Sequence, residues 1–168
     1  MLRSAPSVRC LASVALPLIL AGCGGGGSTP TSPAAPAFQM SSAAVVVDGV
    51  PVNGATVSPH HGGGPTRFEA RLQIGGQPAS GGAVYCRYDL PQGSGMMRHQ
   101  GLFTMYDDGT HGDATPGDGL YCYQDQAERE QYGCHDNAAG PGEYHYEFWG
   151  QHVAYGETEH HRVTVTVR

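Results

Sequence analysis

Polar and apolar residues alternate along short segments that recur through the chain from residue 38 onward. Successive side chains of a β-strand point to opposite faces, so an alternation with a period of two predicts a strand with one buried face. The segment 67–74 is typical, because every second residue from Phe68 to Ile74 is apolar. Seven such strands are predicted, at 43–47, 67–74, 83–88, 101–105, 120–124, 143–149 and 162–167.

Turn-forming residues separate these segments, and helical spacing is nearly absent. The pairs Asp48-Gly49, Asn53-Gly54 and Gly75-Gly76 favour tight turns. The polar segment 124–131 could wind about two helical turns but has no apolar stripe to pack. Seven half-apolar strands in about 130 residues predict an all-β fold, a single antiparallel β-sandwich whose two sheets pack face to face.

The N-terminal region has the composition of a targeting segment followed by a linker. Two Arg residues precede an apolar run at 11–20 and small residues follow it, which is the three-part layout of a secretory signal peptide. The run is shorter than the roughly 20 residues that a membrane-spanning helix needs. Gly, Ser and Pro then dominate the next segment, as in a flexible tether. We therefore assign 1–22 to a signal peptide, 23–37 to a tether and 38–168 to the folded domain.

The end of the signal peptide and the first residue of the tether read Leu-Ala-Gly-Cys at 20–23. This motif resembles the lipobox of bacterial lipoproteins, which implies that Cys23 carries acyl chains such as palmitate and becomes the first residue of the mature chain. The resemblance implies a protein held on a membrane outside the cytoplasm. In that family an Asp after the lipidated Cys retains the protein at the inner membrane. Gly24 stands there instead, which implies the outer membrane in an organism that has one.

The charge balance excludes one class of partner. The 168 residues contain nine Arg, no Lys and fifteen Asp or Glu, for a net charge of −6. Removal of the signal peptide takes away Arg3 and Arg9 and no acidic residue, so the mature chain has 7 − 15 = −8. Binding of nucleic acid needs a clustered basic surface, so we expect no nucleic-acid partner.

Two stretches resemble domains of bacterial surface proteins. Gly-Pro-Gly-Glu-Tyr at 140–144 followed by a last strand of alternating Val and Thr is similar to the end of many immunoglobulin-like and fibronectin-like domains. The segment 107–121 reads D-D-G-x-x-G-D-x-x-x-G-D-G-x-Y, which resembles a motif of immunoglobulin-like domains grouped under choice-of-anchor names. The resemblance implies an extracellular immunoglobulin-like sandwich of about seven strands and implies little about activity.

The acidic segment 107–121 has two interpretations. Asp107, Asp108, Asp113 and Asp118 offer the hard oxygen ligands that Ca²⁺ prefers, and the glycines let backbone carbonyls turn inward. Alternatively, the same residues cap tight turns, because Asp accepts hydrogen bonds from nearby backbone amides and Gly adopts positive φ. The spacing is not that of an EF-hand. We expect any bound calcium to be structural.

Three cysteines remain in the folded domain, since Cys10 leaves with the signal peptide and Cys23 takes lipid. An oxidising compartment favours a disulfide among them, and three cannot all pair within one chain. A bond between Cys122 and Cys134 would close a short polar loop, and we predict this pairing. A bond between Cys86 and Cys122 is the rival, since both lie within predicted strands.

Histidine, cysteine and methionine suggest an alternative function. Imidazole, thiolate and thioether groups bind Cu and Zn, so a periplasmic copper- or zinc-binding lipoprotein is the second hypothesis. None of the candidates has the spacing of a closed metal site. These candidates are His60-His61, Met96-Met97, His99, Cys134-His135 and His160-His161.

Aromatic residues suggest a third class, a carbohydrate-binding or protein-binding module. Part of this set must form the core of a sandwich. The aromatic candidates are Tyr85, Tyr88, Tyr121, Tyr123 and Trp149. Ser94 lacks the G-x-S-x-G frame of a nucleophile elbow, so no catalysis is expected. The sequence thus predicts a lipid-anchored, non-catalytic surface or periplasmic module that binds a protein or glycan partner or has a structural role.

Overall fold

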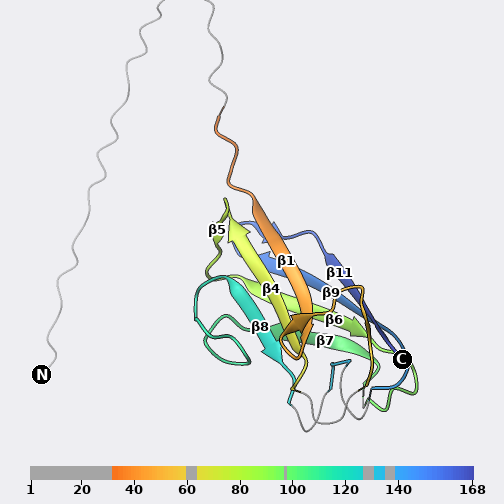
Figure 1. Cartoon of the computed structure of the whole chain (residues 1–168). Coiled ribbons are helices and arrows are strands. Elements are labelled where there is room, and N and C mark those ends of the chain that lie inside the picture. Colours follow the sequence, from red (N-terminus) through yellow and green to blue (C-terminus); the bar gives the residue numbers. More distant parts are fainter. Residues whose placement is uncertain (1–31, 60–63, 97, 127–130, 135–138) are drawn as a thin grey trace, which may run out of the picture. The chain divides into compact units, whose positions relative to one another are not determined.

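The computed structural model describes residues 32–59, 64–96, 98–126, 131–134 and 139–168 (Figure 1). The signal peptide and most of the tether, with Cys23, lie outside the described residues. The chain separates into one unit, Met1–Ala34, and a β-sheet body, Ala35–Arg168. Residues 32–34 of the first unit are exposed and have no regular secondary structure. The described residues contain no helix of the length and apolarity that crossing a membrane requires.

The body contains two sheets, here named sheet A and sheet B. Sheet A has the spatial order β2 (Val50–Pro51), β1 (Phe38–Val47), β4 (Arg67–Ile74), β5 (Gln77–Pro78), with β8 (Leu120–Gln124) also paired to β4. Sheet B has the order β3 (Thr56–Val57), β11 (His161–Val167), β9 (Gly142–His152), β6 (Ala83–Asp89), β7 (Gln100–Met105), with β10 (Gly156–Glu157) also paired to β9. All pairings are antiparallel except that of β3 with β11.

The seven predicted strands correspond to the seven long strands, and the all-β prediction is confirmed. Strands β1, β4 and β8 lie in one sheet, and β6, β7, β9 and β11 lie in the other. Taken in chain order, the first, second and fifth long strands thus share a sheet, which is the arrangement of an immunoglobulin-like sandwich. The four remaining strands have two residues each and escaped the sequence pattern, since alternation needs a longer run.

The core lies between the two sheets and is rich in aromatic rings. Phe68 of β4 is fully buried and contacts Phe103 of β7 and Tyr146 of β9, with ring centroids 5.0 and 5.1 Å apart. Strand β4 belongs to sheet A, whereas β7 and β9 belong to sheet B, so these rings join the two layers. Tilted pairs at such distances are favourable beyond the apolar area that they bury. Each inward row alternates with an outward row, as the sequence pattern predicts.

A tyrosine fixes the chain where it enters β9. The Tyr144 hydroxyl is buried and donates a hydrogen bond to the Gly140 carbonyl, four residues earlier, at 3.1 Å. Immunoglobulin-like domains use such a tyrosine corner at this strand. Gly142 lies between them with φ +141°, and a Cβ there would meet the Pro91 ring at 2.7 Å. The stretch 140–144 therefore sets the start of the strand that carries more of the candidate site than any other.

Among the described residues the predicted disulfide is not formed, and Cys86, Cys122 and Cys134 are all buried. Tyr121 and Tyr123 face the core from β8, so Cys122 between them lies on the outer face of sheet A beside Glu69. Cys86 and Cys134 belong to the core. In this arrangement Cys122 lies on the opposite side of β8 from both other thiols, which separates it from either expected partner.

We predict that all three thiols react with an alkylating reagent only after unfolding. Burial raises the pKa of Cys122 to about 12 and that of Cys86 well above its ordinary value, so neither forms the reactive thiolate at neutral pH. Intact-mass measurement of the domain 38–168, which holds these three cysteines, after iodoacetamide treatment with and without denaturant but without reductant checks this. A disulfide would leave one alkylation in denaturant instead of three.

Candidate binding site

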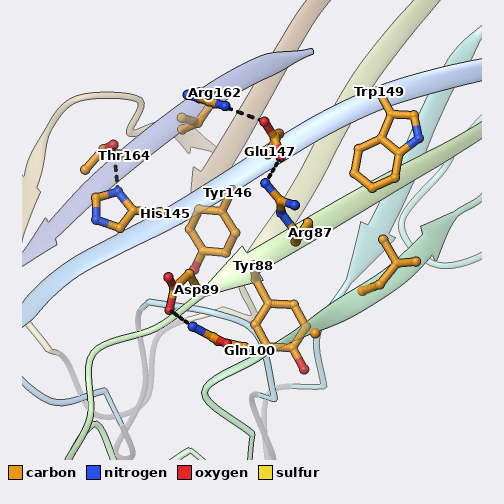
Figure 2. A pocket seen from close by; sticks show the side chains of 13 residues that line it. Arg87, Tyr88, Asp89, Gln100, His145, Tyr146, Glu147, Trp149, Arg162 and Thr164 are labelled. Atoms are coloured by element: carbon orange, nitrogen blue, oxygen red, sulfur yellow. Dashed lines mark hydrogen bonds and ion pairs between the residues drawn. The ribbon is translucent and has the colours of Figure 1, made fainter. Parts of the chain in front are cut away.

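The outer face of sheet B carries a row of charged residues on neighbouring strands. The strand register places Arg162 of β11 opposite Glu147 of β9, and Glu147 opposite Arg87 of β6. Arg87 in turn lies opposite Leu102 of β7, which is exposed. Figure 2 shows the two guanidinium groups reaching Glu147 from either side. The row therefore crosses all four long strands of the sheet.

Glu147 is buried although it lies on an open face. Its side chain is 9% exposed, whereas that of Arg162 is 81% exposed. Arg162 Nε donates a hydrogen bond to Glu147 Oε1 at 2.9 Å, and Arg87 forms an ion pair with Oε2. The hydrogen bond from Arg162 and the charge of Arg87 outweigh burial and lower the pKa of Glu147. The carboxylate thus orients two arginines whose outer parts remain in solvent.

Aromatic rings form a second row beside the charged one. Trp149 of β9 stacks on His160 with centroids 4.9 Å apart and planes 7° apart. On the β6 side, Tyr85 stacks on Trp149 at 5.7 Å and 29°. His160 directly precedes β11, and β11 and β6 flank β9 on opposite sides, so the two neighbours lie on opposite sides of the indole. The stack therefore leaves Trp149 only partly exposed.

The third row completes a groove on this face. His145 Nδ1 lies 3.1 Å from Thr164 Oγ1, and Gln100 Nε2 donates a hydrogen bond to Asp89 Oδ1 at 3.1 Å. The groove has a volume of about 700 Å³ and includes residues from all three rows (Figure 2). That volume is in the range of ligand-binding clefts.

Sequence reasoning found only part of this groove. Of the aromatic candidates, Tyr85 and Trp149 lie on the outer face, whereas Tyr88 and Tyr121 are buried in the core and Tyr123 packs against it. Arg87, Glu147 and Arg162 were not predicted as site residues. Alternation placed Glu147 on the polar side of its strand, and that was the available signal. Their proximity depends on the register between distant strands.

The acidic segment brings together three of its four predicted ligands. Carboxylate oxygens of Asp107, Asp113 and Asp118 lie within 4.8 Å of one another. Asp108 is not part of this group, and it accepts a hydrogen bond from the backbone amide of Thr110 at 2.9 Å. Thr110 lowers the pKa of Asp108, mainly through the hydrogen bond of its side chain and also through that of its backbone amide.

Backbone amides already satisfy much of this acidic cluster. Both oxygens of Asp107 accept hydrogen bonds, from the amides of Gly117 at 2.8 Å and Gly119 at 3.0 Å. Asp113 accepts from the amides of Gly109 at 2.7 Å and Thr115 at 3.0 Å. Burial nevertheless raises the pKa of Asp107, and the charge of Asp113 adds to the shift. The arrangement thus agrees with turn capping and also leaves carboxylates crowded together.

The histidine and cysteine candidates within the described part of the chain do not assemble into a comparable group. Among the residues that the structure covers, the three aspartates are the one group of His, Cys, Asp or Glu close enough to share a metal ion. Met96 and Cys134 are buried in the core, and His160 contacts Glu157 at 3.0 Å. The candidates His60, His61, Met97 and His135 lie outside the described residues.

The serine weighed as a nucleophile is also buried. Ser94 is 2% exposed, and its hydroxyl accepts a hydrogen bond from the Met96 amide at 3.4 Å.

Comparison with known proteins matches the chain to no protein-family model and to no curated protein. The function must therefore be inferred from the groove and the acidic cluster themselves.

We predict that Glu147→Gln lowers the free energy of unfolding by about 1 kcal/mol at pH 7, because it weakens two charge-assisted contacts that are partly exposed. The pKa of Glu147 in the folded state lies below its ordinary value of about 4.3. The contribution is therefore complete above about pH 4.3 and is lost as the pH falls through the folded pKa. Urea unfolding of both proteins over a pH series measures the difference.

Glu143→Gln is the matched control for this comparison. Glu143 is an exposed carboxylate of the same strand whose contact is His145 at 3.5 Å. Its replacement should change the free energy of unfolding little. An equal cost for both variants, or a cost of Glu147→Gln that stays constant down to low pH, contradicts the assigned role of Glu147.

Proposed function

We propose that the protein is a lipid-anchored, extracytoplasmic and non-catalytic binding module, and that the groove of sheet B receives a protein partner. The observation that carries the proposal is the Arg87–Glu147–Arg162 row beside stacked Trp149. Tryptophan, tyrosine and arginine are the residues that contribute most to binding energy at protein interfaces. Here they gather on one open face of an acidic domain, which carries −8 in its mature form.

Preorganisation supports a binding role for the arginines. Glu147 is nearly buried and holds both guanidinium groups in place before any partner arrives. A side chain that is already ordered loses less conformational entropy on binding. The N–H groups of Arg162 that do not contact Glu147 extend into solvent, because the side chain is 81% exposed. They are available to backbone carbonyls or carboxylates of a partner.

The geometry favours a protein over a sugar as the partner. Sugar rings pack on an exposed aromatic face, whereas Trp149 is stacked between His160 and Tyr85 and is only partly exposed. Leu102 is exposed beside Arg87, at the edge of the charged row, and adds apolar surface that a protein can bury. A glycan ligand would have to use ring edges and polar groups alone.

The lipid anchor rests on the lipobox resemblance at 20–23 and on the flexible composition of 23–37. Acyl chains on Cys23 would supply membrane affinity through burial of methylene groups, so the domain needs no spanning helix. The outer membrane is the proposed location in an organism that has one. The tether would let the groove reach partners near the membrane surface.

We predict that Arg162→Ala and Trp149→Ala each weaken partner capture by about tenfold or more, as expected at interface hot spots. Val50→Ala, an exposed apolar position in sheet A, should leave capture unchanged. The immobilised mature protein is mixed with envelope extract, and captured proteins are quantified by mass spectrometry. Arg162 is exposed, so its variant separates loss of binding from loss of folding.

Two outcomes contradict this function. Equal capture by wild type, Arg162→Ala and Val50→Ala would show that the groove does not bind the partner. Binding of the wild type to a glycan array with loss in Trp149→Ala would replace the protein partner by a saccharide.

We also propose that calcium stabilises the acidic cluster without taking part in binding. Three carboxylates whose oxygens lie within 4.8 Å of one another, with the pKa of Asp107 raised by burial, would be relieved by a cation. The role is structural because the cluster packs against sheet A, where Asp118 contacts Arg71 of β4. The groove belongs to the other sheet.

We predict that millimolar Ca²⁺ raises the melting temperature of chelator-treated protein by roughly 3–5 °C. Asp107→Asn should abolish the shift, whereas Asp108→Asn should retain it, because Asp108 lies outside the group of three. Thermal melts with calcium or chelator measure both. An unchanged melting temperature in the wild type would leave the carboxylates as turn caps only.

A further inference from the structure

The turn between β9 and β10 differs in composition from the other turns of the chain. The Tyr155 amide donates to the His152 carbonyl at 3.2 Å, and the Ala154 amide donates to His152 Nδ1 at 3.1 Å. The turns at 48–49, 53–54 and 75–76 use Asp-Gly, Asn-Gly and Gly-Gly pairs whose glycines have positive φ, whereas here a single positive-φ glycine, Gly156, closes the turn. Here the residues at the tip are Val153, Ala154 and Tyr155, named the apolar tip below.

The apolar tip is exposed in a way that folding does not require. Val153 is 99% exposed, and Tyr155 is also exposed. Polar or glycine residues would form the same turn without presenting apolar side chains to water. At Val153 this choice opposes solubility without burying apolar surface, which points to a role outside the fold, whereas Tyr155 also packs beside Phe38.

The apolar tip lies at the end of the sandwich where the tether enters. The Phe38 ring, at the start of β1, lies 5.7 Å from the His152 ring and 6.1 Å from the Tyr155 ring. The Ala37 carbonyl accepts a hydrogen bond from the Gly75 amide at 2.9 Å, which fixes the entry point. Figure 1 shows β1 beginning at this end of the sandwich, and the pairing of β2 with the last residues of β1 puts Val50 at the other end.

The length of the tether brings this end near the membrane. Fifteen residues, 23–37, separate the domain from the proposed lipid anchor. A flexible chain of this length spans about 20 Å on average. Linkage within that distance gives the tip a high effective concentration at the bilayer, so weak contacts suffice. Residues 152–156 contain no Asp, Glu, Lys or Arg, so the tip lacks the acidic charge that anionic headgroups would repel.

We propose that the apolar tip inserts into the headgroup region of the membrane that holds the lipid anchor; this inference rests on the proposed anchor at Cys23. Tyrosine suits this layer because its ring has an apolar body and a polar end. Insertion would orient the domain so that β9 runs toward the bilayer and its last residue, His152, lies nearest to the lipid. Trp149, which lines the groove, is four residues before Val153 and would lie about 13 Å above the tip along β9. The groove would then open to the side.

The test compares two tryptophan substitutions at exposed valines in opposite ends of the sandwich. Full-length lipidated protein carrying Val153→Trp or Val50→Trp is reconstituted into phosphatidylethanolamine–phosphatidylglycerol vesicles with brominated acyl chains. Bromine quenches indole fluorescence at short range, and the wild type supplies the signal of Trp149 for subtraction. Both valines are exposed, at 99% and 60%, so neither substitution disturbs the core.

The expected result is quenching of the tryptophan at 153 by roughly twofold with little quenching of the one at 50, as for a residue seated in the interface. Equal quenching at both positions, or none at 153, in protein that floats with the vesicles overturns the tip proposal and leaves the anchor standing. Protein that fails to float, as the Cys23→Ser control should, overturns the anchor and the tip together. Sedimentation showing that the tip instead joins two copies also overturns it.

Discussion

Burial of one face of each sheet against the other is the constraint on which the other features depend. Phe68, Phe103 and Tyr146 join the layers, and each strand must place every second side chain in that core. Whatever alternates with a core residue is therefore displayed outward. Glu147 lies on the groove side because Tyr146 and Phe148 occupy the core beside it. The same rule sends Cys122 to the outer face of sheet A.

The carboxylates near the two sheets are compensated by different groups. On sheet B, two guanidinium groups compensate Glu147, and its pKa falls. Near sheet A, amide dipoles compensate Asp107 incompletely, and its pKa rises. The first arrangement is complete without an ion and leaves donors facing solvent, which suits recognition of a partner. The second would gain from a cation, which suits a structural role. The proposed binding groove and the proposed calcium loop thus lie against opposite sheets.

The fold was largely predictable from the sequence, and the groove was not. Alternation predicts strands such as 67–74 and 162–167 because it reflects a property local to each strand. The Arg87–Glu147–Arg162 row joins residues from distant parts of the chain by register, which no local pattern encodes. The spacing of Cys122 and Cys134 suggested a disulfide that the structure does not contain. Distance along the chain does not tell on which face of a sheet each thiol lies. The proximity of Asp113 to Asp118 was predictable because both residues lie in one loop.

The central claim is that the outer face of sheet B is the binding surface. Site-specific photo-crosslinking in intact cells tests it even while the partner is unidentified. A benzophenone side chain at Leu102, exposed at the edge of the Arg87 row, is compared with one at Val50, exposed in sheet A. The account predicts a discrete crosslinked protein from position 102 and none from position 50. Crosslinks from 50 alone, or from neither position, would contradict it.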